Sequence, residues 1–251
     1  MRKDTIDINK LKDLVDSGKS YKEISLIMGF TKSSLCRCYT KNFGIKKDRA
    51  ISYRQKLIIT SVQKEIIFGS LLGDMCLVQH VKNIRGSECH SIKQEEYIAY
   101  KHSLLSGLCG KLIDTTTTID GKVYKKKQFT IRPNLNLWEF YNMFYFGENH
   151  KKRIPFNLNM LTPRAIAFWF MDDGFLIKSK NSQELGFSTC CFTLEDLLRL
   201  QQFLDHTYKI KTIIRKNFYL IVRVNSCKLL ADLIKPYMIE SMYYKLGKYL
   251  N

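Results

Sequence analysis

The sequence predicts an α+β protein made of two similar halves, with a small all-helical unit before them. Two apolar segments, 67–75 and 166–174, have the character of buried helices, and each carries aspartate at its end. Similar strand-like and helix-like stretches follow both segments, so that the order α-β-β-α-β-β-α occurs twice. The repeat indicates an internal, pseudo-two-fold duplication.

Length and composition indicate a globular, non-secreted chain. Of the 251 residues, 45% are hydrophobic and 25% are charged, which excludes a wholly disordered protein. No apolar run approaches the roughly 18 residues of a transmembrane helix, and the start Met-Arg-Lys-Asp-Thr lacks an apolar signal segment. We therefore expect an intracellular location and no membrane partner. The sequence does not distinguish an organelle from a bacterial or phage-infected cytoplasm.

The eight cysteines do not form a recognisable metal or disulfide framework. No C-x-x-C pair and no cysteine–histidine cluster with zinc spacing occurs in the sequence. Reduced and mostly buried thiols are therefore the expectation.

The charge balance indicates a polyanionic partner. Lysine and arginine number 41 against 23 aspartate and glutamate, which gives a formal charge of +18. Such a protein attracts nucleic acid or an anionic membrane at long range. Because the charge is spread along the chain and not concentrated in one amphipathic helix, nucleic acid is favoured. A charge that serves solubility alone is the alternative.

Residues 1–45 are predicted to form a separate helical unit. Apolar residues recur at helical spacing from Ile8 to Val15, and Ser20 with Glu23 forms a capping-box pattern at the start of a second helix. Gly29 permits a tight turn before a third helix that runs to about Lys41. Residues 46–56 are predicted to be a basic linker.

Segment 20–39 resembles the DNA-binding helix-turn-helix of resolvases and bacterial regulators. The resemblance implies that the third helix is a recognition helix, whose polar and cationic side chains meet bases and phosphates. These side chains are Lys32, Ser33, Ser34, Arg37 and Lys41. A three-helix bundle that serves protein contacts is the alternative.

The two halves are predicted at residues 57–150 and 151–251. Apolar periodicity after the first motif helix predicts strands at 75–81 and 88–94, a helix at 97–108, strands at 113–119 and 128–131, and a helix at 135–146. After the second motif helix it predicts strands at 175–178 and 185–189, a helix at 194–208, strands at 211–215 and 218–224, and a helix at 226–234.

A family resemblance rests on the two apolar segments. They read Ile-Phe-Gly-Ser-Leu-Leu-Gly-Asp-Met and Ile-Ala-Phe-Trp-Phe-Met-Asp-Asp-Gly, and they are similar to the two motifs of the LAGLIDADG homing endonucleases. The flanking stretches 151–155 and 233–246 are similar to those of single-chain, intron-encoded members. The resemblance implies two antiparallel sheets that form a DNA-binding saddle, in a monomer with internal pseudo-symmetry.

Three positions depart from the family pattern. Met75 stands in place of the final glycine of the first motif, and Phe168 and Asp172 stand where the second motif has small residues. We therefore expect an asymmetric contact between the two motif helices. The last aspartate of each motif is present.

The glycines of the first motif predict a close pair of helices. Gly69 and Gly73 are four residues apart, so they share one helix face that a second helix can approach. If the partner is the second motif helix, Asp74 and Asp173 lie together where the helices end. Two like charges close together are unfavourable, and a divalent cation with hard oxygen ligands removes that cost. The alternative is that both aspartates merely terminate helices.

The resemblance implies a metal-dependent centre that acts on phosphodiesters. Asp74 and Asp173 would bind Mg²⁺, for which Mn²⁺ can substitute, and the backbone carbonyls of Gly73 and Asp172 are further candidate ligands. Metal held against a scissile phosphate can activate water and stabilise the leaving oxygen. One acidic residue from each half would give one site for each DNA strand.

The resemblance also implies one basic residue from each half, Lys152 and Lys245. Their cations would polarise the attacking water or offset the charge of the transition state. Lys151 competes with Lys152 for this role, and ordinary contact with phosphate or solvent is the alternative for both residues.

DNA reading is expected from one face of each sheet, because successive strand residues point to opposite faces. Lysine and arginine can contact guanine edges, and glutamine can read adenine. The candidate residues are Lys93, Gln94, Lys125, Lys127, Arg132, Lys178, Lys180, Arg215 and Arg223. Simple solvation is the alternative for each of them.

These features predict a site-specific homing endonuclease that acts on double-stranded DNA. The family habit is a double-strand break with short 3′ overhangs in a long target, which promotes mobility of the encoding intron or gene. The alternatives are a maturase that binds its own intron RNA and a non-cleaving DNA-binding regulator. The paired aspartates favour the nuclease, because neither alternative needs the metal.

Overall fold

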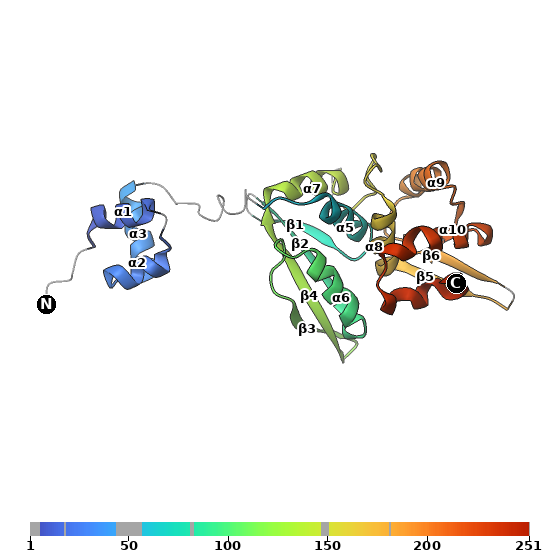
Figure 1. Cartoon of the computed structure of the whole chain (residues 1–251), viewed down its shortest axis with the longest axis horizontal. Helices are drawn as coiled ribbons and strands as arrows, with labels where there is room; N and C mark the ends of the chain where they lie inside the picture. The colour runs from blue at the N-terminus through green and yellow to red at the C-terminus, as the bar shows by residue number, and fades with distance from the viewer. Residues whose placement is uncertain are drawn as a thin grey trace. The chain divides into compact units, whose positions relative to one another are not determined.

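The chain divides into two compact units, Met1–Tyr53 and Arg54–Asn251 (Figure 1). The computed structural model describes residues 6–17, 19–43, 57–80, 83–146, 151–180 and 182–250. The expected basic linker, 46–56, lies outside the described residues. Among the helices described, none has the length and apolar character needed to cross a membrane.

Three helices form the first unit, α1 (Ile8–Asp16), α2 (Tyr21–Met28) and α3 (Lys32–Phe43). Each helix contributes to one small apolar core. The buried side chains of this core are Leu11, Val15, Ile24, Leu35 and Tyr39. The predicted helices are therefore present, and the third extends slightly beyond its expected end.

Local capping explains where α2 begins and ends. The Ser20 hydroxyl accepts a hydrogen bond from the backbone N–H of Glu23, and the Glu23 carboxylate accepts one from the backbone N–H of Ser20 at 2.6 Å. The predicted capping box is thus confirmed. Gly29 ends the helix with φ of 73°, a left-handed conformation that glycine adopts without steric cost.

The second unit contains the expected order α-β-β-α-β-β-α twice, which confirms the α+β architecture. The first half consists of α5 (Ser61–Leu72), β1 (Cys76–His80), β2 (Asn83–Ser91), α6 (Glu95–Leu104), β3 (Ile113–Ile119), β4 (Lys122–Asn134) and α7 (Trp138–Phe144). The second half consists of α8 (Pro163–Asp173), β5 (Gly174–Lys178), β6 (Gln183–Phe187), α9 (Leu194–Tyr208), β7 (Thr212–Ile214), β8 (Leu220–Val222) and α10 (Val224–Ile234). A 3-10 segment, Glu240–Leu250, closes the second half.

Each half builds one four-stranded antiparallel sheet of the same topology. The strand orders are β1-β2-β4-β3 and β5-β6-β8-β7. One continuous apolar core runs through both halves and contains the inner faces of α5 and α8. The two sheets are therefore joined through the motif helices.

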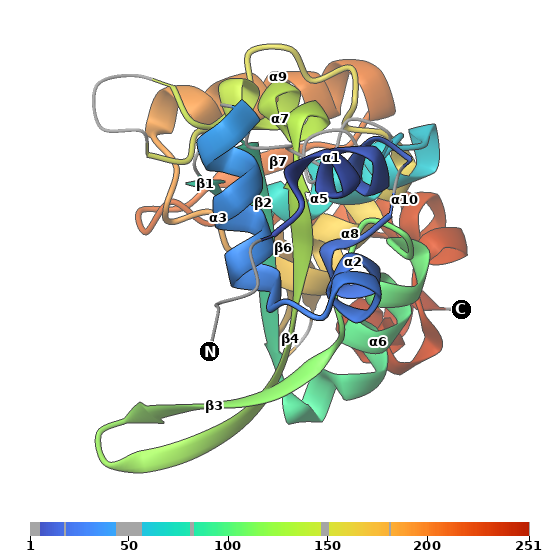
Figure 2. The ribbon, with the colours of Figure 1, turned by 90° about the vertical axis from the view of Figure 1, so that its left-hand side faces the viewer.

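The hairpin of β3 and β4 is longer than the sequence pattern predicted. β4 starts at Lys122, where a strand was expected only at 128–131, and it pairs with β3 from Lys122 to Gln128. Asp120 and Gly121 join the strands with φ of 48° and 76°, as in the two-residue turns whose twist matches that of a hairpin. Backbone pairing beside this turn extends the strand through lysine-rich sequence, and the hairpin projects as a long arm (Figure 2).

The strand predicted at 88–94 ends earlier than expected. β2 stops at Ser91, and a 3-10 turn, Ile92–Gln94, follows it. The Ser91 side chain accepts a hydrogen bond from the backbone N–H of Lys93, which stabilises this turn. The prediction that Lys93 and Gln94 lie on the sheet is therefore wrong.

The motif helices α5 and α8 cross at very close range. A Cβ atom added to Gly69 would overlap the backbone carbonyl of Ala165, and one added to Gly73 would lie 2.5 Å from the Cβ atom of Asp172. Glycine at both positions is thus a steric requirement of the pair. The contact joins unlike residues, as the departures from the motif predicted.

A methyl group at Gly69 should test this packing. We expect Gly69→Ala to lower the free energy of unfolding by about 3 kcal/mol or more, the upper part of the range for overpacked cores, because a rigid carbonyl has to move. Alanine has a higher helix propensity than glycine, so a loss of stability in this variant cannot come from helix propensity. The measurement is urea unfolding followed by circular dichroism.

Gly110→Ala is the matched control, because its added Cβ atom would lie 3.5 Å from Thr130, an ordinary contact. Equal unfolding midpoints for the two variants would contradict the close packing of α5 and α8.

Candidate functional site

The two motif aspartates lie where the paired helices end. Asp74 directly follows Gly73, the C-terminal cap of α5, and its side chain is 42% exposed. Asp173 is the last residue of α8, and its backbone carbonyl accepts a hydrogen bond from Ser188 at 2.9 Å. Each aspartate is therefore fixed at the junction of a motif helix and the first strand of its half.

The electrostatics of Asp173 show that the two carboxylates share one environment. Burial, together with the charges of Asp74 and Asp172, raises the pKa of Asp173 to about 7. Lys152 and Lys245 act in the opposite direction but do not restore the ordinary value. The negative charge at the helix ends is thus incompletely balanced.

This donor set fits a divalent cation. Asp74 is open to solvent and Asp173 is partly so. Burial first, and then repulsion from Asp74 and Asp172, raise the pKa of Asp173, and a bound cation would offset both effects. Both groups offer the carboxylate oxygens that Mg²⁺ and Mn²⁺ prefer. Asp74 and Asp173 are therefore the residues that could hold a metal here.

The two expected lysines contact the ends of the motif helices. Lys152 donates hydrogen bonds to the backbone carbonyls of Gly73 at 2.7 Å and Met75 at 3.2 Å. Lys245 is buried and donates to the carbonyls of Met171 at 2.6 Å and Asp172 at 2.9 Å. Cations at a helix C-terminus offset the negative end of its dipole.

The arrangement of the lysines is pseudo-symmetric. Gly73 and Asp172 each precede the last aspartate of a motif, and each carbonyl has one lysine. These are also the two carbonyls expected as further metal ligands. In the structure they are hydrogen-bonded to Lys152 and Lys245.

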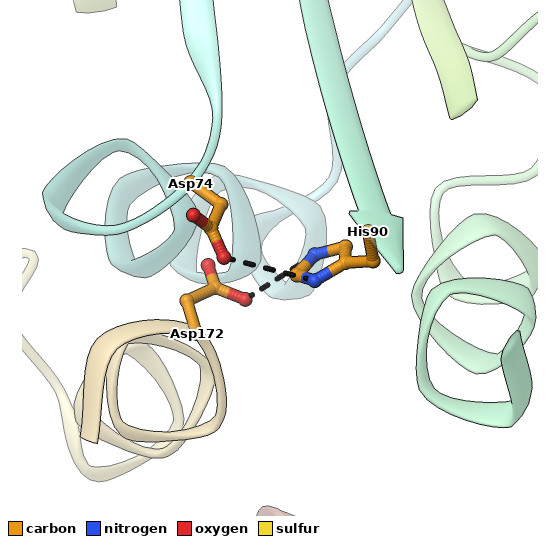
Figure 3. Close-up of side chains that lie close together, drawn as sticks. All are labelled: Asp74, His90 and Asp172. Carbon is orange, nitrogen blue, oxygen red and sulfur yellow. Dashed lines mark ion pairs between the residues drawn. The ribbon is translucent and has the colours of Figure 1, made fainter. Parts of the chain in front are cut away.

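A third acidic side chain, that of Asp172, reaches toward the first half. One ligand atom each from Asp74, His90 and Asp172 lie within 4.8 Å of one another (Figure 3). His90 is on β2, and its Nδ1 atom lies 3.6 Å from Asp74 Oδ2. Its Nε2 atom lies 3.7 Å from Asp172 Oδ1.

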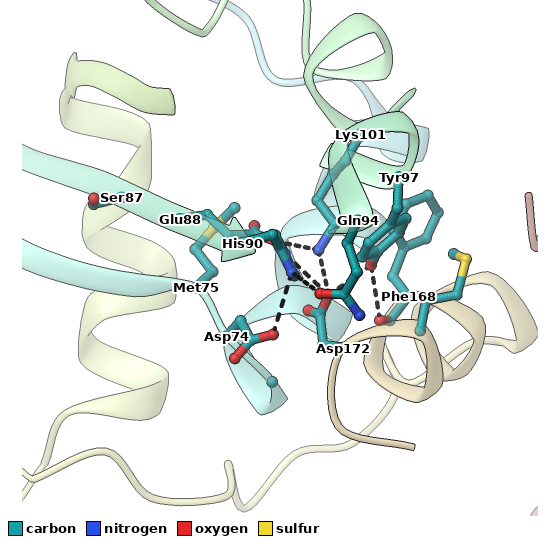
Figure 4. Close-up of polar contacts among 12 residues, drawn as sticks. Asp74, Met75, Ser87, Glu88, His90, Gln94, Tyr97, Lys101, Phe168 and Asp172 are labelled. Atoms are coloured by element: carbon teal, nitrogen blue, oxygen red, sulfur yellow. Dashed lines mark hydrogen bonds and ion pairs between the residues drawn. The ribbon is translucent and has the colours of Figure 1, made fainter. Parts of the chain in front are cut away.

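A buried polar network surrounds this group (Figure 4). Lys101 on α6 donates to Asp172 Oδ1 at 2.7 Å and also pairs with Glu88. Glu88 Oε1 lies 2.7 Å from His90 Nε2. Tyr97 donates its hydroxyl proton to Asp172 at 2.6 Å. The network thus joins β2 and α6 of the first half to α8 of the second.

Opposite charges keep Lys101 and Glu88, the central ion pair of this network, ionised. Burial alone would lower the pKa of Lys101, but Asp172 and Glu88 outweigh it and raise that pKa. Burial would likewise raise the pKa of Glu88, but Lys101 and His90 lower it. Breaking such a buried pair typically costs about 3–5 kcal/mol.

Sequence reasoning missed this network. The sequence pattern gives Asp172 as a departure from the motif and as a backbone ligand, and it assigns no role to the Asp172 carboxylate or to Glu88, His90 and Lys101. Glu88 and His90 are two residues apart and so share one strand face, which was an available signal. Lys101 was a second signal, because it shares one face of its helix with the apolar residues Tyr97 and Ile98, which are buried.

The residues expected to read DNA fall into three groups. Lys125 and Arg132 on β4 and Lys178 on β5 are exposed strand residues. Lys127 is paired with Glu95 and Asp114, each at 2.9 Å. The others lie outside strands, and these are Lys93, Gln94, Lys180, Arg215 and Arg223.

Two arginines expected on strands lie beyond them for a simple reason. β7 and β8 are only three residues long, so Arg215 follows β7 and Arg223 is the N-terminal cap of α10. Arg215 also pairs with Glu184 at 2.7 Å. The strand placement predicted for these two residues is therefore wrong.

The expected recognition helix is α3, and its candidate side chains are exposed. These are Lys32, Ser33, Ser34, Arg37 and Lys41. Both serine hydroxyls contact the Thr31 hydroxyl, at 3.1 Å and 2.9 Å. They therefore take part in the start of the helix.

Comparison with known proteins gives one family match. Residues 64–229 match the model of the LAGLIDADG DNA endonuclease family. The cytochrome b mRNA maturase bI2 of Saccharomyces cerevisiae is 35% identical over 210 residues, which cover 74% of this chain and 47% of the yeast protein. The chain therefore matches only about half the length of that relative.

Two further proteins are similar over most of their length. The DNA endonuclease I-ChuI of Chlamydomonas applanata is 29% identical over 209 residues, which cover 75% of this chain and 96% of that protein. The solved structure of the homing endonuclease I-WcaI bound to its DNA recognition sequence aligns with a TM-score of 0.70 and 22% identity, over 82% of this chain and 96% of that one. This structural match supports the fold.

The raised pKa of Asp173 predicts a pH-dependent stability. Between about pH 4 and 7 the folded protein holds a proton on Asp173 that the unfolded chain lacks, so this stabilisation is lost as pH rises through 7. We expect Asp173→Asn to raise the melting temperature of the metal-free protein by on the order of 5 °C at pH 8. At pH 5, where the unfolded chain has already lost this proton but the folded protein still holds it, the difference should be smaller.

Thermal unfolding with a chelator, at both pH values, measures this. Asp205→Asn, at an exposed position on α9, is the control and should show no such change with pH. The same stability gain for Asp173→Asn at pH 5 and pH 8 would argue against a raised pKa of Asp173.

Proposed function

Because the chain belongs to the LAGLIDADG DNA endonuclease family, we propose that it is a site-specific homing endonuclease that hydrolyses one phosphodiester in each strand of a long DNA target. The observation that carries this proposal is the close α5–α8 pair, which ends in Asp74 and Asp173 with one lysine at each helix end. Short 3′ overhangs and mobility of the encoding intron or gene belong to the same proposal.

Asp74 and Asp173 would hold Mg²⁺, or Mn²⁺ in its place. The metal supplies an activated water and stabilises charge on the scissile phosphate. The protein contributes the position of both carboxylates, because Asp173 is the last residue of α8 and Asp74 comes directly after Gly73, the C-terminal cap of α5.

Lys152 and Lys245 would act on the charge of the reaction. Each ammonium group is held at a helix C-terminus by backbone carbonyls, so its direction is set before DNA binds. A preorganised cation stabilises charge that develops in the transition state at little reorganisation cost. In this proposal Lys152 serves the end of α5 and Lys245 the end of α8.

The two sheets would grip the duplex on either side of these acids. Exposed Lys125, Arg132 and Lys178 offer contacts to phosphates and guanine edges. The related I-WcaI structure, which has the same fold, is a complex with a DNA recognition sequence. The helical first unit would add contacts through α3, with Arg37 and Lys41 as the cationic members.

A maturase is the second candidate function. The yeast relative, at 35% identity, bears the name of a cytochrome b mRNA maturase. Binding of the protein's own intron RNA would need the basic surface but not the paired aspartates. The two functions therefore differ in their dependence on Asp74 and Asp173.

Cleavage of DNA with the ends sequenced tests the proposal. The parent protein, Asp74→Asn and Asp173→Asn are each incubated with Mg²⁺ and a complex DNA pool that includes the intron-free form of the flanking sequence. We expect one recurrent double-strand break from the parent. The cleavage rate of each variant should fall by at least about 100-fold. Loss of a residue that only orients a metal ligand typically lowers activity by about 10–100-fold, so a larger loss indicates a metal ligand.

Binding to intron RNA is measured in parallel by filter retention. No cut by the parent together with tight RNA binding would replace the endonuclease with the maturase. Duplex binding without either activity would indicate a regulator.

Lys245 offers a second test within the same assay. Lys245→Met removes the cation and keeps most of the apolar stem, so we expect cleavage to fall by about 100-fold or more while duplex binding changes little. Lys248→Met, at an exposed position nearby, is the control. Equal cleavage by the two variants would exclude a catalytic role for Lys245.

A further inference from the structure

The first acidic centre differs from the second in its surroundings. The strand registers relate the two halves, because Cys76 pairs with Ser87 beside Asp74 and Phe175 pairs with Gly186 beside Asp173. Counting along β2 and β6 from these pairs, Glu88 corresponds to Phe187. His90 in the same way corresponds to Thr189.

The same correspondence between the two halves holds for the helices α6 and α9. Tyr97, Ile98 and Lys101 are the buried residues of α6, and they match the buried residues Asp196, Leu197 and Leu200 of α9. Lys101 therefore has Leu200 in its place in the second half.

Apolar packing occupies the positions of the network in the second half. Phe187 stacks on Trp169 with ring centroids 3.8 Å apart. Thr189 donates its hydroxyl proton to the backbone carbonyl of Phe218. Within the described part of the chain, the Asp173 centre thus has no counterpart of the Glu88, His90 and Lys101 cluster.

The helix crossing explains why this network belongs to one half. Asp172 and Gly73 precede the two motif aspartates and face each other, and a Cβ atom on Gly73 would lie 2.5 Å from Asp172 Cβ. Only one of these positions can therefore carry a side chain. Asp172 has it, and its carboxylate reaches Lys101 in the first half.

We propose that His90 is a positioning residue for the Asp74 carboxylate, and that the Glu88–Lys101–Asp172 network makes the two metal centres unequal. His90 Nδ1 lies 3.2 Å from Gln94 Oε1 and 3.6 Å from Asp74 Oδ2, while its Nε2 atom is held 2.7 Å from Glu88. The ring cannot turn without breaking a contact to a buried carboxylate that Lys101 also holds. The proposal rests on the proposed function in one respect, which is that Asp74 binds a divalent metal.

Carboxylates that bind metal are commonly oriented by a second layer of polar groups. Loss of such a partner costs about 10–100-fold in metal affinity or activity. Asp74 needs this support because it is exposed and comes after the helix end. Asp173 is the last residue of α8 and has the helix itself as support.

The test uses three variants of the full chain. His90→Leu removes both nitrogen atoms and leaves the Glu88–Lys101 pair intact, and His90→Gln keeps a polar group at the same place. His102→Leu is the matched control. His102 is a half-buried histidine of α6 with one hydrogen bond, to the Gly110 carbonyl at 2.8 Å.

The first readout is binding of Mn²⁺ without DNA, followed by the electron paramagnetic resonance of the free ion. We expect the parent to bind in two classes of affinity. His90→Leu should weaken one class by about 10–100-fold, His90→Gln should weaken it less, and His102→Leu should match the parent. Unchanged binding in His90→Leu, or equal weakening of both classes, would overturn the proposal.

The second readout is the nicking rate of each strand at the site that the parent cleaves. His90→Leu should slow one strand by about 10–100-fold and the other by less than about 3-fold. Equal slowing of both strands with a lowered melting temperature would show a merely structural role. If the parent cuts no DNA, the endonuclease fails, and Mn²⁺ binding still decides on His90.

Discussion

The close crossing of α5 and α8 is the contact on which the second unit depends. Gly69 and Gly73 remove the side chains that would separate the two backbones, and the apolar faces of both helices join the cores of the two halves. Because the helices end side by side, the negative ends of both dipoles meet there. The aspartates that follow add further negative charge, so the packing creates the electrostatic problem that the site has to solve.

The chain balances this charge in two different ways. At the helix ends, Lys152 and Lys245 donate to backbone carbonyls, and Asp173 keeps a raised pKa. In the interior, out of contact with solvent, Lys101 forms ion pairs with both Asp172 and Glu88. The buried ion pairs form a fixed network, whereas the helix ends keep negative charge that a divalent cation can neutralise.

Sequence reasoning could predict the duplication, the α5–α8 pair and its asymmetry, because each depends on local patterns. Apolar periodicity and glycine spacing show which face of a helix is buried or closely packed, and they do so without knowledge of the residues that this face contacts. The direction of the Asp172 side chain depends on Lys101 and Tyr97, which lie far away in the sequence. The length of β4 likewise depends on pairing across the Asp120–Gly121 turn, where the added residues have no apolar pattern.

The asymmetry of the site follows from the symmetry of the scaffold. In a duplicated fold, equivalent residues of the two motif helices face each other where the helices meet at the pseudo-two-fold axis. Where the backbones are closest, two side chains cannot share the space, so a carboxylate in one half requires glycine in the other, as Asp172 and Gly73 show. A polar network anchored at that position must then enter one half alone. The same close contact that makes the two helices a pair therefore makes the two acidic centres different.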